Sequence, residues 1–121
     1  MKITVTPHYP QLTQIDVQLW RIDKSVEFTV DGTPFTVPKG VKTDGASVPR
    51  AFWSIMPPLS NYTNAAIVHD WLYQTKRIDN RKIVDKIFLY AMAYLGVSRW
   101  KRNIMYRAVR MFGGFVWNRR R

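Results

Sequence analysis

Apolar and polar residues alternate along the first third of the chain, which is typical of strands that bury one face. The alternation runs over residues 11–22 and is more regular over 26–30. Asp31-Gly32 follows, a pair that favours a tight turn, and the alternation then resumes. We therefore predict a hairpin over 25–37 and mainly antiparallel β-structure for residues 1–43.

Apolar residues recur at helical spacing in the rest of the chain. Three helices are predicted, over about 63–74, over about 80–95, and from 98 to near Gly113-Gly114. A short apolar helix at 51–56 precedes them and ends at Pro57-Pro58. The pattern predicts the α+β class: a small antiparallel sheet followed by three or four helices.

The third predicted helix has two different sides. One side is mainly apolar and carries Trp100, Ile104, Ala108, Met111 and Phe115. The other side carries Arg99, Arg102, Tyr106 and Arg110. The aromatic residues of the helical half, Trp100 and Phe112 among them, lie mostly at core spacing, so we expect them to pack inside. A single domain is expected over 1–121, with 44–118 mainly α and 119–121 a basic tail.

The composition narrows the class of protein. The chain has 121 residues, 46% of them hydrophobic, and no cysteine, which fits one globular domain and excludes disulfides and thiolate metal sites. We find no signal peptide at the start. No apolar stretch approaches the roughly 20 residues that a membrane-spanning helix needs.

Positive charge dominates, with 19 Lys and Arg against 8 acidic residues and a net charge of +11. No acidic residue follows Asp85. A field of one sign attracts polyanions such as nucleic acid, anionic lipid or acidic protein. The following residues predict either a polyanion-facing surface or a solvated helix face: Arg99, Arg102, Arg107, Arg110, Arg119, Arg120 and Arg121.

One polar pair, His69-Asp70, interrupts the most apolar predicted helix. Burying such a pair costs free energy unless it finds partners. Tyr73 shares a face with His69, and a short connection makes the first two long helices antiparallel, which brings Asp85 to the height of His69. An imidazole oriented by a carboxylate is the layout of a general base. The alternative is a structural network that ties the loop at 43–50 to the helices.

Further candidate residues lie in that loop and beside the histidine. Asp44 and Ser47 line the same pocket if they are functional, and otherwise form a turn and a helix cap. Arg50 could pair with Asp44 or Asp85, or bind a substrate phosphate. Asp70 can hold a hard cation such as Ca²⁺ with the help of loop carbonyls.

The His69-Asp70-x-x-Tyr73 motif resembles that of phospholipase A2, in which a second helix supplies an aspartate that orients the histidine. Residues 84–88 resemble that second helix, so the likeness covers about 61–90. It implies a phospholipid ester as substrate, with His69 as base, Asp85 and Tyr73 as supporting residues and Asp70 as the calcium ligand. The chain departs from that family at the calcium loop, because residues 59–62 contain no glycine.

A second resemblance covers roughly residues 35–117. Four motifs carry it: Val-Pro-x-Gly-Val-x-Thr-Asp-Gly-Ala-Ser-x-Pro-Arg-x-Phe-Trp, Ala-Ala-x-x-His-Asp-x-Leu-Tyr, Asp-x-Ile-Phe and Met-Tyr-x-Ala-Val-Arg. These are similar to a family of small phage and prophage proteins of unknown function. The likeness implies a phage origin, with a place in the virion or in the cytoplasm of the infected host.

Three hypotheses follow. The first is a hydrolase with His69 as general base, acting at an anionic lipid surface. The second is a non-enzymatic phage head or tail component that contacts other virion proteins, or an effector that binds a host protein. The third is a non-specific nucleic-acid binder that uses the basic C-terminal helix.

Overall fold

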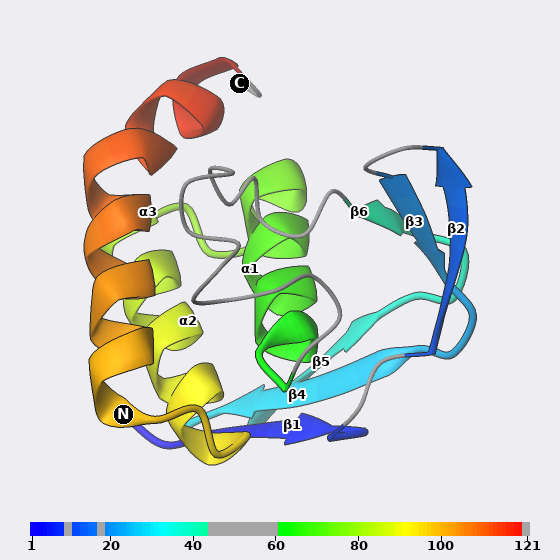
Figure 1. Cartoon of the computed structure of the whole chain (residues 1–121), viewed down its shortest axis with the longest axis horizontal. Coiled ribbons are helices and arrows are strands. Elements are labelled where there is room, and N and C mark those ends of the chain that lie inside the picture. Colours follow the sequence, from blue (N-terminus) through cyan, green and yellow to red (C-terminus); the bar gives the residue numbers. More distant parts are fainter. Residues whose placement is uncertain (9–10, 17–18, 44–60, 120–121) are drawn as a thin grey trace.

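Antiparallel strands followed by three helices make up the described part of the chain, which is residues 1–8, 11–16, 19–43 and 61–119 of a computed structural model (Figure 1). This arrangement confirms the predicted α+β class. The predicted short helix at 51–56 lies outside the described residues.

The first sheet has the strand order β1-β4-β5, with β1 at Ile3–Thr6, β4 at Val26–Val30 and β5 at Thr33–Val37. The predicted hairpin is confirmed, because β4 and β5 pair antiparallel across Asp31 and Gly32, whose φ angles are 50° and 87°. Strand β1 was not predicted, since four residues are too few to show a clear alternation and its partner β4 lies far along the chain.

The second sheet has the order β2-β3-β6, with β2 at Leu12–Asp16, β3 at Leu19–Ile22 and β6 at Lys42–Thr43. Both pairings are antiparallel, and the pairing of β2 with β3 is irregular between Gln14 and Asp16. A register shift of this kind offsets the alternation by one residue, which explains why the pattern over 11–22 was uneven.

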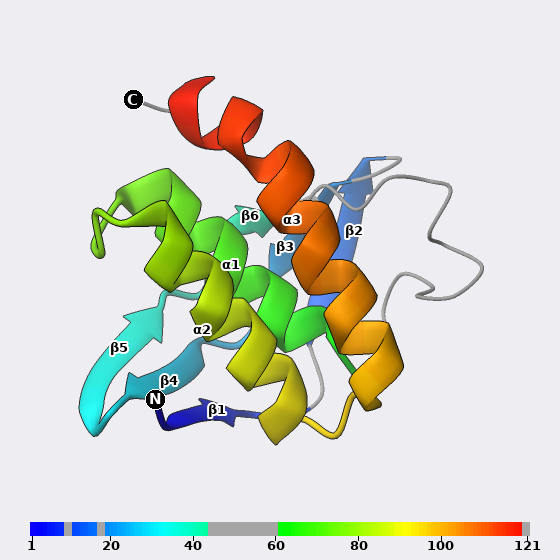
Figure 2. The same ribbon diagram turned by 90° about the vertical axis from the view of Figure 1, so that its left-hand side faces the viewer.

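Helix α1, at Thr63–Thr75, lies at the centre of the molecule, with α2 and α3 on one side and the strands on the other (Figures 1 and 2). All of its residues from Thr63 to Tyr73 are buried. A helix that is enclosed all round has little amphipathic character, and its polar residues must find partners inside the protein.

Helix α2, at Arg81–Tyr94, returns antiparallel to α1 after a short connection (Figure 2). It begins where the side chain of Asn80 accepts a hydrogen bond from the backbone N–H of Ile83, at 3.1 Å. It ends before Gly96, whose φ of 85° is a left-handed conformation that glycine adopts without steric strain. The predicted helix pair is therefore confirmed at both ends of α2.

Helix α3, at Arg99–Arg119, continues past the two glycines that were predicted to end it. Gly113 and Gly114 lie where α3 approaches Tyr73 and Arg81 closely, so their missing side chains serve packing rather than termination. Beyond them Trp117 is buried, with its ring 5.0 Å from that of Tyr73. The burial of Trp117 stabilises the part of α3 that follows the two glycines.

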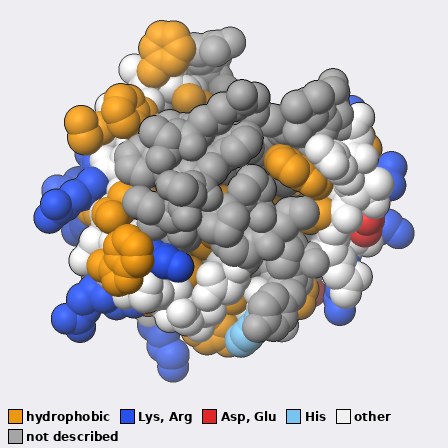
Figure 3. Space-filling model, in the orientation of Figure 1, with side chains coloured by type: hydrophobic (Ala, Val, Ile, Leu, Met, Phe, Trp, Pro, Cys, Tyr) orange, Lys and Arg blue, Asp and Glu red, His pale blue; other side chains and the backbone are white. Residues whose placement is uncertain are grey.

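The prediction that Trp100 and Phe112 pack inside is wrong. Each is 56% exposed, and Met111 is 75% exposed, whereas the buried apolar residues of α3 are Met105, Ala108, Val109 and Trp117. Hydrophobic side chains are visible along the α3 edge of the molecule in Figure 3. Among the described residues, no helix is both long enough and apolar enough to cross a membrane.

Candidate active site

Four side chains, drawn from all three helices, meet around the carboxylate of Asp85 in the interior of the helical half. Helix α1 contributes His69 and Tyr73, α2 contributes Arg81 and Asp85, and α3 contributes Arg110. We call this group the Asp85 cluster. The Asp85 side chain has no exposed surface, so every charge and hydrogen bond on it must come from protein groups.

One oxygen of Asp85 binds the two groups from α1. Oδ1 lies 2.7 Å from Nε2 of His69 and accepts a hydrogen bond of 2.6 Å from the Tyr73 hydroxyl. His69 and Tyr73 are one helical turn apart, so both reach the same point on the antiparallel neighbour. This part of the site agrees with the geometry predicted from the sequence.

The other oxygen of Asp85 faces two guanidinium groups. Nη1 of Arg110 donates to Oδ2 at 2.8 Å, and Nε of Arg81 lies 3.8 Å from the same atom. Nη2 of Arg81 also donates to the carbonyl oxygens of Val109 and Arg110, at 3.0 and 2.6 Å. Arg81 therefore holds α3 against α2 at the position that brings Arg110 to the carboxylate.

The surroundings shift two pKa values in opposite directions. Burial, the largest single influence, raises the pKa of Asp85, but hydrogen bonds from His69, Tyr73 and Arg110 together hold that pKa below its ordinary value. Burial, and then the neighbouring Asp85 carboxylate, raise the pKa of the Tyr73 hydroxyl far above its ordinary value. Asp85 is thus ionised and Tyr73 is a neutral donor at physiological pH.

The His69 ring is enclosed on its faces by aromatic neighbours. The ring centroid of Tyr73 lies 4.3 Å away and that of Phe88 lies 4.7 Å away, and His69 as a whole is 3% exposed. Within the described part of the chain, the hydrogen bonds of this ring involve Nε2 only. Because Nε2 bonds to Asp85, a reaction that uses this ring as a base would use Nδ1, the other ring nitrogen.

Asp70 bonds to a neighbouring residue of α1. Its Oδ2 accepts a hydrogen bond of 2.8 Å from the Gln74 side chain, which also lies 3.5 Å from the carbonyl oxygen of Lys42. Ca²⁺ takes six to eight oxygen ligands, whereas the described residues contain no group of three or more metal-ligating side chains.

Two members of the cluster were not predicted. Arg81 stands four residues before Asp85 on one helix, a spacing that indicates an ion pair and could have been used. Arg110 was assigned to a polyanion-facing surface, yet it binds Asp85, and no local signal in the sequence indicates this contact between α2 and α3.

The other predicted residues are distributed as follows. Arg99 and Arg107 are exposed, and Nη1 of Arg102 donates to the carbonyl oxygen of Val97 at 2.9 Å. Five predicted residues lie outside the described part of the chain and have no structural outcome, as does the side chain of Arg119: Asp44, Ser47, Arg50, Arg120 and Arg121.

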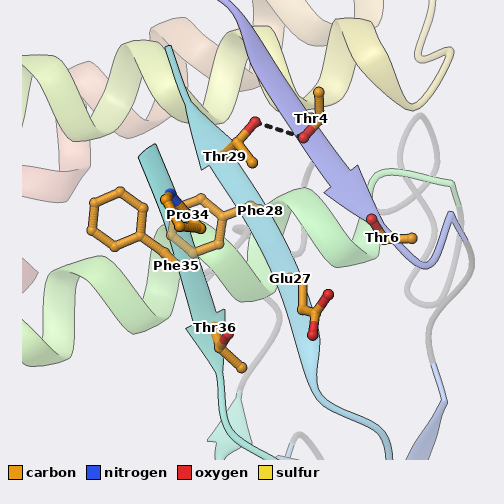
Figure 4. Close-up of a pocket in the computed structure, with 8 residues that line it drawn as sticks. All are labelled: Thr4, Thr6, Glu27, Phe28, Thr29, Pro34, Phe35 and Thr36. Atoms are coloured by element: carbon orange, nitrogen blue, oxygen red, sulfur yellow. Dashed lines mark hydrogen bonds between the residues drawn. The ribbon is translucent and has the colours of Figure 1, made fainter. Parts of the chain in front are cut away.

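A separate hollow of about 260 Å³ lies on the first sheet, lined by residues of β1, β4 and β5 (Figure 4). Threonine hydroxyls dominate its described lining, and those of Thr4 and Thr29 bond to each other at 2.6 Å. Glu27 is the one titratable residue among the described lining. The described lining contains no histidine paired with a carboxylate, so the Asp85 cluster is the stronger candidate for chemistry.

Comparison with known proteins identifies a family and two relatives. Residues 20–109 match the model of a family described as "Protein of unknown function (DUF1353)". An uncharacterized protein of Sinorhizobium fredii, y4jT, is 38% identical over 96 residues, which are 74% of this chain and 28% of that protein. A second one, y4iH, is 30% identical over 86 residues, which are 69% of this chain and 36% of that protein.

The chain thus spans about a third of the length of these curated relatives, at 28% and 36%. No solved structure matches the chain. Neither the family nor the relatives name a reaction, so the chemistry has to be argued from the cluster.

Proposed function

We propose that this chain, which belongs to the DUF1353 family of proteins of unknown function, is an ester hydrolase with His69 as general base. One observation carries the proposal. Nε2 of His69 lies 2.7 Å from the Asp85 oxygen that also accepts the Tyr73 hydrogen bond, so the ring is held in one tautomer and one orientation.

In this reaction Nδ1 of His69 takes a proton from a water molecule, and the water oxygen attacks the ester carbonyl carbon. The carbonyl oxygen becomes negative until the bond to the alcohol oxygen breaks. The proton on Nδ1 then passes to that leaving oxygen, and the ring is neutral again. The ionised Asp85 stabilises the imidazolium while it carries the proton.

The two arginines tune this carboxylate. Arg110 donates to Oδ2 and Arg81 lies close to it, and hydrogen bonds from His69, Tyr73 and Arg110 together keep Asp85 ionised although its side chain is fully buried. The two arginines also draw charge away from the oxygen that faces the ring, which makes Asp85 a weaker partner for an imidazolium than a carboxylate alone. We infer a slow hydrolase whose base is held firmly in place.

The resemblance to phospholipase A2 supports a phospholipid ester as the first substrate class to test. The motifs shared with small phage proteins support a role in the virion or the infected host. Asp70 remains the candidate ligand if the reaction uses Ca²⁺.

The main alternative is a non-enzymatic phage structural component or host-binding effector in which the cluster is a scaffold. The observation that favours it is the burial of the cluster: Asp85 has no exposed surface, and His69 is 3% exposed. Fully satisfied buried networks can specify a unique core without any chemistry.

The substitution His69→Gln separates these functions. The Gln amide can still donate to Asp85 but cannot accept a proton, so folding should change little while general-base catalysis is lost. Release of fatty acid from mixed phosphatidylcholine and phosphatidylglycerol vesicles should fall about 10²–10⁴-fold, with Ca²⁺ present. Repeating the assay with a chelator, and with Asp70→Asn, tests the metal.

Tyr73→Phe is the matched control, because it removes a hydrogen bond to Asp85 and leaves the base. We expect partial activity from that variant. Wild-type protein that releases no more fatty acid than buffer, or a His69→Gln variant as active as wild type, would overturn the hydrolase proposal. If the wild-type protein has no hydrolytic activity and the His69→Gln variant is only less stable, the result would support the scaffold role.

A further inference from the structure

Helix α3 presents large apolar side chains to solvent along its outer side. Trp100 and Phe112 are each 56% exposed, Phe115 is 71% exposed and Met111 is 75% exposed. We call these four residues the α3 outer face. Trp100, Met111 and Phe115 fall within about 60° of one another around the helix, at roughly 100° per residue, and Phe112 lies about 60° beyond Phe115.

The α3 outer face exposes a large apolar area. It extends about 22 Å along the helix axis, from the 1.5 Å rise of 15 residues. At these exposures each side chain shows roughly 100–150 Å² to water, so the four together show on the order of 500 Å². The largest apolar patch on a typical single chain covers about 300–600 Å² and is often functional.

Positive charge surrounds the α3 outer face. Arg99 and Arg107 are exposed, and Nζ of Lys101 lies 5.6 Å from the centre of the Trp100 ring. The sequence has no acidic residue after Asp85, which is itself buried and paired. Figure 3 shows hydrophobic and basic side chains interspersed along the α3 edge, with no acidic side chain visible there.

We propose that the α3 outer face docks onto an anionic lipid bilayer. Its apolar side chains enter the boundary between headgroups and acyl chains, while Arg99 and Arg107 contact lipid phosphates. A Trp at one end of the face suits the membrane interface, where amphipathic rings gather.

Charge argues against a second copy of this chain as the partner. Two copies meeting through this face would bring like charges together in a protein with a net charge of +11. Nucleic acid is disfavoured because single strands bind in positively charged grooves, whereas this is the convex side of one helix and Met111 offers no ring for stacking.

Docking goes beyond the proposed hydrolysis, because it needs no chemistry at His69. It also depends on residues outside the family match, which ends at residue 109, before Met111, Phe112 and Phe115.

Flotation with lipid vesicles tests the proposal. Wild-type protein should float with vesicles of equal parts phosphatidylcholine and phosphatidylglycerol, and much less with phosphatidylcholine alone. The double substitution Met111→Ser and Phe115→Ser should lower the partition coefficient at least tenfold, because the protein loses the favourable free energy of moving these two apolar side chains from water into the bilayer. Arg107→Gln should lower it several-fold at low salt, with a smaller loss at high salt.

Matched controls remove similar groups elsewhere. Ile15→Ser removes a 40% exposed apolar side chain from β2, and Lys24→Gln removes an exposed charge. Neither should change flotation more than slightly. The His69→Gln variant should float like wild type, so that failure of docking and failure of hydrolysis are seen separately.

Several results would overturn the proposal. These are no flotation with anionic vesicles, or flotation that the control substitutions reduce as much as those on the α3 outer face. Binding to a single-stranded oligonucleotide but not to vesicles would also overturn it, and would make the α3 outer face a nucleic-acid surface. A dimer in sedimentation that the double substitution abolishes, without vesicle binding, would make it an interface between copies.

Discussion

Substitution of Gly113 by Ala tests the packing of α3 against α1, on which the Asp85 cluster depends. A Cβ atom added at Gly113 would lie 2.6 Å from the Tyr73 hydroxyl oxygen and 3.5 Å from Nη2 of Arg81. The first distance is well inside van der Waals contact, so the Tyr73 ring or α3 must move. Tyr73 is 2% exposed and bonded to Asp85, which leaves the ring little room to yield.

The magnitude follows from two opposing effects. Displacing the hydroxyl costs a hydrogen bond to a charged group, about 1.5–3 kcal/mol. Replacing Gly by Ala inside a helix returns about 1 kcal/mol. The Gly113→Ala variant should therefore be less stable than wild type by roughly 0.5–2 kcal/mol.

Gly114→Ala is the matched control, on the same helix and one residue away. Its Cβ would lie 3.4 Å from Cζ and Nη1 of Arg81, which is ordinary contact. Only the gain in helix propensity applies, so this variant should be more stable by up to about 1 kcal/mol.

Chemical and thermal unfolding measure the contrast. The two variants should differ by about 1.5–3 kcal/mol, with Gly113→Ala the less stable, and by about 4 °C in melting temperature for each kcal/mol at this chain length. If both substitutions stabilise the protein equally, Tyr73 does not lie against Gly113. The contact that also brings Arg110 to Asp85 would then be wrong.

Three further outcomes are expected. Arg110→Met should cost about 2–4 kcal/mol of unfolding free energy because it removes a partner from a buried carboxylate, whereas the exposed control Arg107→Met should cost about 0.5 or less. Because the folded-state pKa of Asp85 is lowered, the ionised Asp85 contributes its full share of the unfolding free energy above about pH 4, and this share is lost as the pH falls through the folded-state pKa. Asp85→Asn should therefore make the unfolding free energy less dependent on pH in the acid range. Burial raises the pKa of Tyr73, and raises that of Tyr62 to about 12, so the free energy of unfolding should fall as the pH rises above about 10. Tyr73→Phe should remove part of that fall and leave the part due to Tyr62. Denaturant titrations from about pH 2 to about pH 11 measure both the acid and the alkaline limb, and unchanged limbs in the variants would refute these assignments.

The regular elements were largely predictable because their signals are local. The turn at Asp31-Gly32, the cap at Asn80 and the stop at Gly96 each depend on residues within one turn of the chain. Strand β1 and the end of α3 were missed because their causes are distant. Strand β1 pairs with β4, and α3 continues to bury Trp117 against Tyr73.

Half of the Asp85 cluster could be predicted in the same way. A short connection between two helices fixes their direction and relative height, so His69 and Tyr73 could be placed opposite Asp85 from spacing alone. The partners of Oδ2 could not all be found like this. Arg110 arrives from a third helix whose rotation about its own axis is not determined by the lengths of the connections.

By itself, the sequence determined where the long helices lie, that two of them run antiparallel, and that an imidazole, a phenol and a carboxylate meet between them. Only the tertiary structure decided which side of α3 faces inward. A buried carboxylate left without cationic partners costs several kcal/mol, about as much as leaving one or two large apolar side chains in water. Turning Arg110 toward Asp85 therefore competes with burying Met111 and Phe115, and in this fold the charge is satisfied inside while the apolar residues face outward.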